Sequence, residues 1–226
     1  MPQSLSVAVC ISEDVTLSDF ITPMELLSSI NDAGDPVWGA GMGEVPYSIK
    51  IDYVAPTLDP VVSLKGRNSP TINPTLTYAD ATAHGKQFDI IWVPAGPFPS
   101  SRIPKEEIEF IKQQAPKAKY LLSVCGGAVQ LAFAGVLSGK RATTNKAWFR
   151  VIVAETPKDI EWVAKARWVV DGKVWTSSGV TAGFDMALAF IEHLVGPKAA
   201  RHIRGLVEVR EITDQDDPFA EFHGLV

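Results

Sequence analysis

The chain has 226 residues, of which 46% are hydrophobic and 21% are charged. A chain of this length and composition is expected to fold around a full hydrophobic core as one soluble α/β domain, which excludes a disordered protein. Its formal net charge of −5 and its lack of any basic run argue against a nucleic-acid partner.

The N-terminal region and the two cysteines indicate where the protein works. The apolar run at residues 7–11 is too short for a signal or membrane segment, and no basic region precedes it. Cys10 and Cys125 form neither a disulfide framework nor the Cys/His spacing of a metal site. We therefore expect a cytoplasmic protein in a reducing compartment, with no membrane partner and no metal.

The first elements are a buried strand at 5–11, a turn region at 12–21 and a helix from 22 to about 31. Thr22 is suited to the N-cap of this helix, Pro23 to its first position and Glu25 to a capping box. Cys10 lies in the strand and is interpreted as core packing. Asp19 lies between strand and helix, either as a solvated or capping carboxylate or as part of a site.

The later elements alternate between strands and helices. Before residue 118 we expect a strand at 47–55, a small hairpin at 61–68, a strand at 88–93 followed by a sharp turn, and a helix at 104–115. After residue 135 we expect a short strand within 136–144, a helix at 146–155 capped by Asn145, a hairpin at 168–176, a helix at 182–195 capped by Thr181, a helix at 198–206 and a strand at 207–212. This order predicts a mostly parallel sheet with helices on both faces, and the lack of repeats or linkers predicts a single domain over 1–226.

The most informative stretch is the junction of a strand and a helix at Cys125. Residues 120–124 are a short apolar run typical of a buried strand, and the helix pattern that follows ends before Gly135. Small residues flank the cysteine at Ser123, Gly126 and Gly127. This pattern is typical of a nucleophile elbow, a strained turn that exposes a side chain at a helix N-terminus and favours thiolate. We interpret Cys125 as a nucleophile rather than as a buried structural cysteine.

Asp19 and Gly96 are predicted to lie beside Cys125. Each of the three follows the carboxyl end of a predicted parallel strand, and such ends form one rim where ligands bind. Cys125 would attack an electrophilic carbon, and the N–H groups of Gly126 and Gly96 would stabilise the developing negative charge. A protonated Asp19 would donate a hydrogen bond to the sulfur and later a proton to the adduct. Taken alone, Gly96 indicates only a tight turn.

These residues resemble the ThiJ/PfpI superfamily, and in particular its isocyanide (isonitrile) hydratase branch. The resemblance covers most of the chain and rests on Asp19 with Thr22-Pro23, Val93-Pro94-Ala95-Gly96, Ser123-Val124-Cys125-Gly126-Gly127, residues 139–144 and residues 179–185. It implies a flavodoxin-like three-layer α/β sandwich of the class I glutamine-amidotransferase type, usually a homodimer, with no cofactor. It also implies that Cys125 is the nucleophile, Asp19 its hydrogen-bonded acid partner, and Gly96 and Gly126 the oxyanion donors.

The same resemblance implies an activity on a small electrophile. Cys125 would add to the terminal carbon of an isocyanide, Asp19 would supply a proton, and water would release an N-substituted formamide from the thioimidate. Three alternatives stay open: glutathione-independent conversion of α-oxoaldehydes to hydroxy acids, a non-enzymatic redox sensor oxidised at Cys125, and the ligand domain of a regulator.

The chain departs from the family pattern at two positions. Many members carry a histidine where this chain has Asn145, and asparagine cannot serve as a base at neutral pH, which weakens the protease and glyoxalase interpretations. Ala95 stands where a glycine is usual, so the turn is expected to be reshaped. We expect the site to be lined by Asn145, Ala95, Thr144 and Trp148, with Phe98 and Phe149 as further walls. None of the four histidines follows a predicted strand whose carboxyl end lies beside the elbow; they are His84, His193, His202 and His223.

Overall fold

The computed structural model of the chain describes residues 2–64 and 68–226 and is built on a seven-stranded sheet. The strand order is β10-β11-β7-β6-β1-β2-β5, and every neighbouring pair is parallel except β10 with β11. The strands are β1 (Gln3–Cys10), β2 (Tyr47–Ala55), β5 (Leu76–Thr77), β6 (Ile90–Val93), β7 (Tyr120–Val124), β10 (Trp168–Asp171) and β11 (Val174–Ser177). The expected mostly parallel sheet is confirmed.

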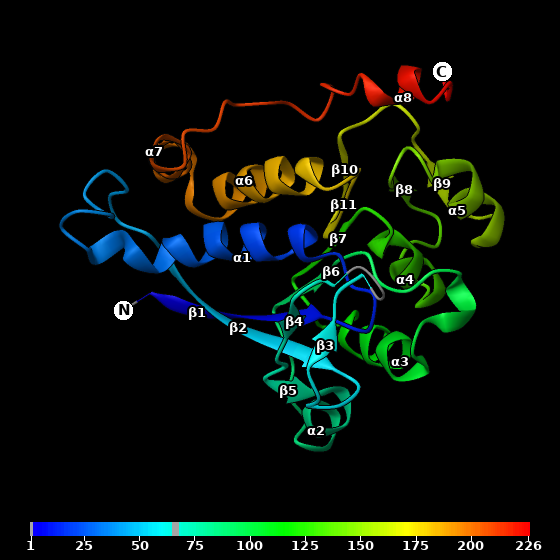
Figure 1. Ribbon diagram of the computed structural model, residues 1–226. Helices are drawn as coiled ribbons and strands as arrows, with labels where there is room; N and C mark the ends of the chain where they lie inside the picture. The colour runs from blue at the N-terminus through cyan, green and yellow to red at the C-terminus, as the bar shows by residue number, and fades with distance from the viewer. Residues whose placement is uncertain (1, 65–67) are drawn as a thin grey trace.

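Helices cover both faces of this sheet and make three layers (Figure 1). One face carries α1 (Ile21–Ser28), α6 (Thr181–Val195) and α7 (Pro197–Leu206). The other carries α2 (Tyr78–Ala83), α3 (Lys105–Gln114) and α4 (Gly127–Phe133). Two further helices, α5 (Phe149–Glu155) and α8 (Phe219–Phe222), lie toward the end of the sheet that holds β10.

Alternation along the central strands divides the core between these layers. In β1, Val7 and Val9 pack with the α1 and α6 side, whereas Ala8 and Cys10 pack with the α3 and α4 side. Successive strand residues point to opposite faces, so a strand buried on both sides must be apolar throughout. Each fully buried aliphatic side chain contributes roughly 1.5–3 kcal/mol. The interpretation of Cys10 as core packing is confirmed, since Cys10 is 1% exposed.

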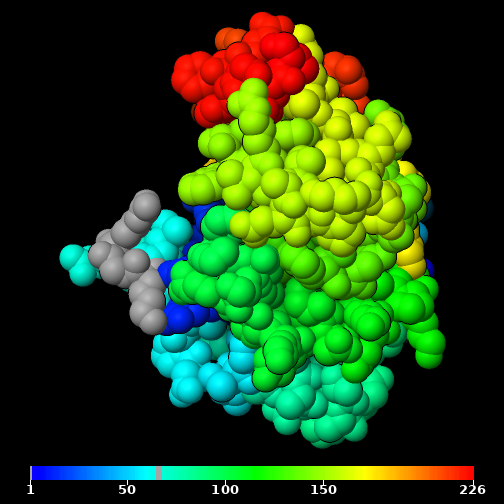
Figure 2. Space-filling model, turned by 90° about the vertical axis from the view of Figure 1, so that its right-hand side faces the viewer, coloured from blue at the N-terminus to red at the C-terminus, as the bar shows by residue number. Residues whose placement is uncertain are grey.

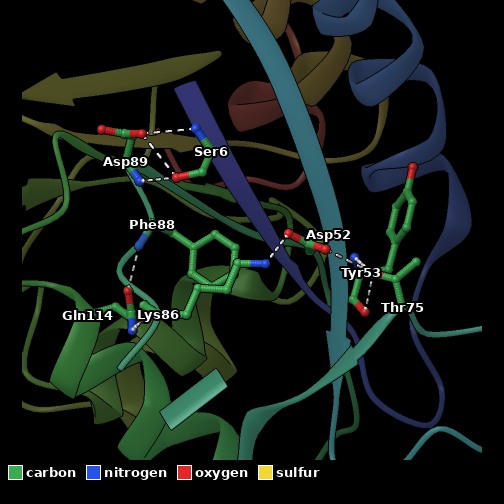
Figure 3. Close-up of polar contacts among 8 residues, drawn as sticks. All are labelled: Ser6, Asp52, Tyr53, Thr75, Lys86, Phe88, Asp89 and Gln114. Atoms are coloured by element: carbon green, nitrogen blue, oxygen red, sulfur yellow. Dashed lines mark hydrogen bonds and ion pairs between the residues drawn. The ribbon is translucent and has the colours of Figure 1, made fainter. Parts of the chain in front are cut away.

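Polar side-chain contacts join β1, β2 and the residues just before β6 to one another and to α3 (Figure 3). The carboxylate of Asp89, just before β6, accepts hydrogen bonds from Ser6 N–H (2.9 Å) and Oγ (3.0 Å) in β1. Gln114 at the end of α3 accepts from Phe88 N–H at 2.9 Å, and Lys86 Nζ lies 2.7 Å from Asp52 in β2. The register brings the carboxyl ends of β1, β6 and β7 to one rim.

The N-terminal ends of three helices differ from the sequence prediction. Helix α1 begins at Ile21 because a 3-10 helix (Leu17–Asp19) leads directly into it, so Thr22 is not a cap and no capping box forms. Asn145 does not cap α5, which begins at Phe149; its Oδ1 accepts from the N–H groups of the preceding turn. Thr181 is the first residue of α6 rather than its cap.

The predicted strand at 207–212 is wrong. These residues form a turn and an exposed extended segment, and Glu208 has a φ of +55°, which interrupts the alternating pattern. The predicted small hairpin pairs β3 (Val61–Val62) with β4 (Thr71–Ile72), and residues 65–67 of its expected turn lie outside the described part of the chain. Among the described residues, no helix has the length and apolarity needed to cross a membrane.

Candidate active site

Cys125 occupies a strained turn between β7 and α4. Its φ is +58°, in the left-handed region that non-glycine residues seldom adopt. The turn is held by hydrogen bonds from Cys125 N–H to the carbonyl of Ser178 (2.9 Å) and from Thr144 Oγ1 to the carbonyl of Cys125 (2.7 Å). A Cβ on Gly127 would lie 2.0 Å from the carbonyl oxygen of Val93, so only glycine fits there. The backbone therefore has the geometry of a nucleophile elbow.

The sulfur of Cys125 is surrounded by N–H donors, yet the thiol keeps its proton. Asn145 Nδ2 lies 3.2 Å from Sγ, and the N–H groups of Gly126 and Val180 also favour the thiolate. Burial, followed by the nearby carboxylate of Asp19, outweighs these donors and raises the pKa of the Cys125 thiol to about 12. The helix N-terminus favours the thiolate, as the sequence predicts, but desolvation is the larger effect.

Asp19 is fully buried at the end of the 3-10 helix that follows β1. Burial raises the pKa of its carboxyl to about 7, although a hydrogen bond from Ala95 N–H to Oδ2 (3.0 Å) acts in the opposite direction. Among the described residues, Oδ1 has no hydrogen-bond partner. The structure records no hydrogen bond between Asp19 and the Cys125 sulfur within the described chain, so the two interact through space in this state.

The turn that carries Gly96 is held by its neighbours in one orientation. Ala95 N–H donates to Asp19, and Ala95 C=O accepts from Thr16 N–H at 2.9 Å. Among the described residues, the Gly96 N–H has no recorded partner, which leaves it available at the rim. A Cβ on Gly96 would lie 2.8 Å from Gln130 Nε2. Ala95 is not among the residues with positive φ, so alanine is accommodated there without strain.

Cys125 opens into a pocket of about 420 Å³. Four of the six expected lining residues border it, namely Ala95, Asn145, Trp148 and Phe98, and so do the predicted oxyanion donors Gly96 and Gly126. The rings of Phe98 and Trp148 form one wall, with centroids 5.5 Å apart. Two expectations are wrong. Phe149 packs against Trp162 instead, and Thr144 supports the elbow from behind without lining the pocket.

Sequence reasoning missed the polar corner of this pocket. Arg102 and Asp14 both border it and form an ion pair at 2.6 Å, although they are 88 residues apart in the chain. No local pattern marks such a pair. None of the residues that line the described pocket is a histidine. The described residues also contain no cluster of three or more His, Cys, Asp or Glu that could hold a metal ion.

A three-layer α/β fold with a cysteine at a strained elbow, a buried carboxylic acid beside it and two backbone N–H groups on the rim defines a class of cysteine-centred α/β proteins. The chain belongs to the DJ-1/PfpI family, whose family model matches residues 5–193. The resemblance inferred from the motifs is thereby confirmed.

Relatives of known sequence and structure agree with this assignment. An isonitrile hydratase from Pseudomonas putida is 31% identical over 202 residues, which are 89% of this chain and 77% of that protein. A ThiJ/PfpI family protein from Pseudomonas syringae is 25% identical, with a TM-score of 0.73 over 96% of this chain and 78% of that one. DJ-1beta from Drosophila melanogaster has a TM-score of 0.72 at 19% identity, covering 92% of this chain and all of that one. The flavodoxin-like fold is confirmed.

Proposed function

We propose that the protein hydrates an isocyanide to an N-substituted formamide, with Cys125 as nucleophile and Asp19 as acid. The observation that carries this proposal is the pairing of a protonated thiol with a buried carboxyl whose pKa is about 7. An isocyanide carbon must gain both a proton and a nucleophile, and this pair holds both. The relationship to an isonitrile hydratase supports the same chemistry.

The first step forms a thioimidate. The terminal carbon of R–NC takes a proton from Asp19 and a bond from the sulfur of Cys125, whose own proton returns to the carboxylate, so R–N=CH–S–Cys125 results. No oxidant, reductant or cofactor enters this balance. The N–H donors around the sulfur stabilise it while it loses its proton, since hydrogen bonds to a charged group are stronger than neutral ones.

The second step is hydrolysis. Water adds to the thioimidate carbon, the carbon–sulfur bond breaks, and R–NH–CHO leaves with the thiol restored. In this proposal Gly126 N–H, which otherwise faces the sulfur, and Gly96 N–H bind the oxygen as its negative charge develops, which is worth about 10²–10³ in rate per donor. Asp19 relays the proton between the attacking water and the departing groups.

The alternatives fit this geometry less well. Many family members carry a histidine where this chain has Asn145, and the conversion of α-oxoaldehydes is expected to use that histidine as a second base beside the carboxyl; Asn145 cannot accept a proton at neutral pH. A peroxide sensor calls for a low-pKa thiolate, whereas the pKa of Cys125 is raised. We further propose that residues 1–226 form one domain that works in the cytoplasm as a homodimer without a cofactor.

The proposed function is tested by comparing the wild type with Cys125→Ala on an aryl isocyanide and on methylglyoxal. We expect formamide production by the wild type and a loss of at least roughly a thousandfold in Cys125→Ala, because the covalent intermediate cannot form. Cys10→Ala is the matched control and keeps its activity, since Cys10 lies in the core on the opposite side of the sheet. Turnover of methylglyoxal alone, or oxygen uptake by Cys125 with no turnover, would contradict the proposal.

The wall formed by Phe98 and Trp148 predicts a preference for apolar substituents on the isocyanide. Trp148→Ala removes an indole that is 55% exposed and faces Phe98, so we expect the KM for an aryl isocyanide to rise about tenfold while kcat changes little. Trp38→Ala, which removes a similarly exposed indole outside the pocket, serves as control. An equal rise in KM in both variants would exclude a role for this wall.

A further inference from the structure

Asn145 lies on an irregular segment between β8 (Arg141–Ala142) and α5, and its side chain is fixed at both ends. Its Nδ2 points at the Cys125 sulfur, while its Oδ1 accepts from Ala147 N–H at 2.9 Å. The residue before it, Thr144, bonds the Cys125 carbonyl. These contacts orient the amide, and they depend on the position of the segment itself, to which the next residue, Lys146, adds a buried anchor.

Lys146 is buried, with only 4% of its surface exposed. Its Nζ donates to Thr143 Oγ1 (2.7 Å) and to the carbonyl of Ala166 (2.8 Å), and lies 3.4 Å from Asp217 Oδ2. Asp217 is equally withdrawn from solvent, and Oδ2 has no hydrogen-bond partner among the described residues. A buried ammonium is tolerated only beside a counter-charge, because it has given up its hydration. Asp217 supplies that charge.

Asp217 belongs to the C-terminal segment, residues 213–223, which follows the part of the chain matched by the family model. The segment is attached by Arg167 N–H to the carbonyl of Asp214 (2.7 Å) and by an exposed ion pair between Lys165 and Glu221 (2.8 Å). Figure 2 shows it in red, packed on the green and yellow residues that precede α6. A cavity of about 200 Å³ separates it from the start of α6 and has Asn145 in its lining.

We propose that Asp217 is a positioning residue of the active site: through Lys146 it holds the Asn145 amide against the sulfur of Cys125. When Asp217 has no charge, Lys146 turns toward solvent and carries the adjoining Asn145 away from the thiol. The C-terminal segment is then a support of the site, although it touches no reacting atom. This inference rests on the proposed role of Cys125, but it is tested on thiol reactivity, which does not require the isocyanide reaction.

The test measures the rate of Cys125 alkylation by iodoacetamide as a function of pH, in a Cys10→Ala background so that one thiol reacts. Asp217→Asn keeps the oxygen that accepts from Phe219 N–H but removes the charge. We expect alkylation at pH 8 to slow about tenfold and its pH profile to move upward, because the thiolate loses a donor. Glu221→Gln breaks the exposed ion pair of the same segment and is expected to leave the rate unchanged.

A double-mutant cycle separates positioning from general support of the fold. In an Asn145→Ala background, Asp217→Asn is expected to slow alkylation by less than about twofold, because the contact it maintains is already absent. Equal slowing with and without Asn145 would overturn the proposal. If Asp217→Asn does not fold, the double variant Lys146→Met, Asp217→Asn is used instead. It removes both charges, so no unpaired ammonium is buried in the core. Slow alkylation in that folded variant supports the proposal, because the ion pair that ties the Asn145 segment to Asp217 is absent, and a wild-type rate overturns it.

Discussion

Asp19→Asn is expected to reduce turnover of an isocyanide by about 10²–10⁴-fold while making the protein more stable above pH 7. The amide retains an oxygen for Ala95 N–H, so the turn before Gly96 keeps its support, but it cannot donate a carboxylic proton. The loss should be in kcat, since the group acts on the reacting carbon. An activity loss below tenfold would remove Asp19 from the proposed mechanism.

The gain in stability follows from the raised pKa of Asp19. The unfolded carboxyl has a pKa of 3.8 and the buried one about 7, so the folded protein binds the extra proton between these values. The wild type therefore loses stability as pH rises from about 4 to about 7, and the full cost is present above that window. A shift of this size corresponds to at most roughly 4 kcal/mol. The neutral Asp19→Asn variant has no such loss, and its Tm relative to the wild type should increase across the window.

Asp89→Asn is the matched control because the pKa of Asp89 is shifted in the opposite direction. Partial burial acts to raise the pKa of this carboxyl, but the hydrogen bonds from Ser6 and the ammonium of Lys119 together outweigh it and hold the pKa below its usual value. Asp89 thus contributes stability above about pH 4 that is lost as pH falls. The Tm of Asp89→Asn relative to the wild type should decrease as pH rises through 4. Thermal melts from about pH 2 to about pH 8 cover both windows and distinguish the two slopes, and parallel slopes would contradict both pKa shifts.

The sequence alone could predict that the three site residues lie close together, because the topology of a parallel sheet brings them to the same rim. Asp19, Gly96 and Cys125 follow the ends of β1, β6 and β7, which are consecutive strands of a parallel sheet. The apolar run at 120–124 is continuous and bounded by a glycine pair, so the strand that carries Cys125 is predictable with its observed ends. Where hydrophobic periodicity and turn residues agree, the local sequence pattern is sufficient to predict an element and its ends.

The parts that could not be predicted depend on contacts between distant residues. The Arg102–Asp14 pair and the buried Lys146–Asp217 pair each join segments far apart in sequence, and neither residue type signals a partner. The alternating pattern at 207–212 resembles a strand, but Glu208 adopts a positive φ and the segment pairs with no strand of the described sheet. The raised pKa of Cys125 likewise depends on how deeply the elbow is buried, which spacing does not reveal.

Gly127→Ala is expected to unfold the elbow, with a loss of at least about 3 kcal/mol in the free energy of unfolding. The added Cβ would lie 2.0 Å from the carbonyl oxygen of Val93 and 2.9 Å from its carbonyl carbon, and these backbone atoms belong to a central strand that cannot move aside. Relief requires α4 to move away from β6, which displaces Cys125 and the N–H of Gly126.

The adjacent Gly126→Ala is the control that isolates this clash. Gly126 has a φ of −66°, which alanine adopts freely, and a Cβ there would meet Ala95 at ordinary contact distances, 3.4 Å from its Cβ and 3.9 Å from its Cα. We expect this variant to stay within about 1 kcal/mol of the wild type in urea unfolding and to alkylate normally at Cys125. Both changes add one methyl group within the same turn. A similar loss of unfolding free energy in both variants would show that the turn needs the backbone freedom of glycine at either position, and that the clash with Val93 is not the cause. A loss in Gly127→Ala alone would show that the close approach of α4 to β6 holds Cys125 in its strained conformation.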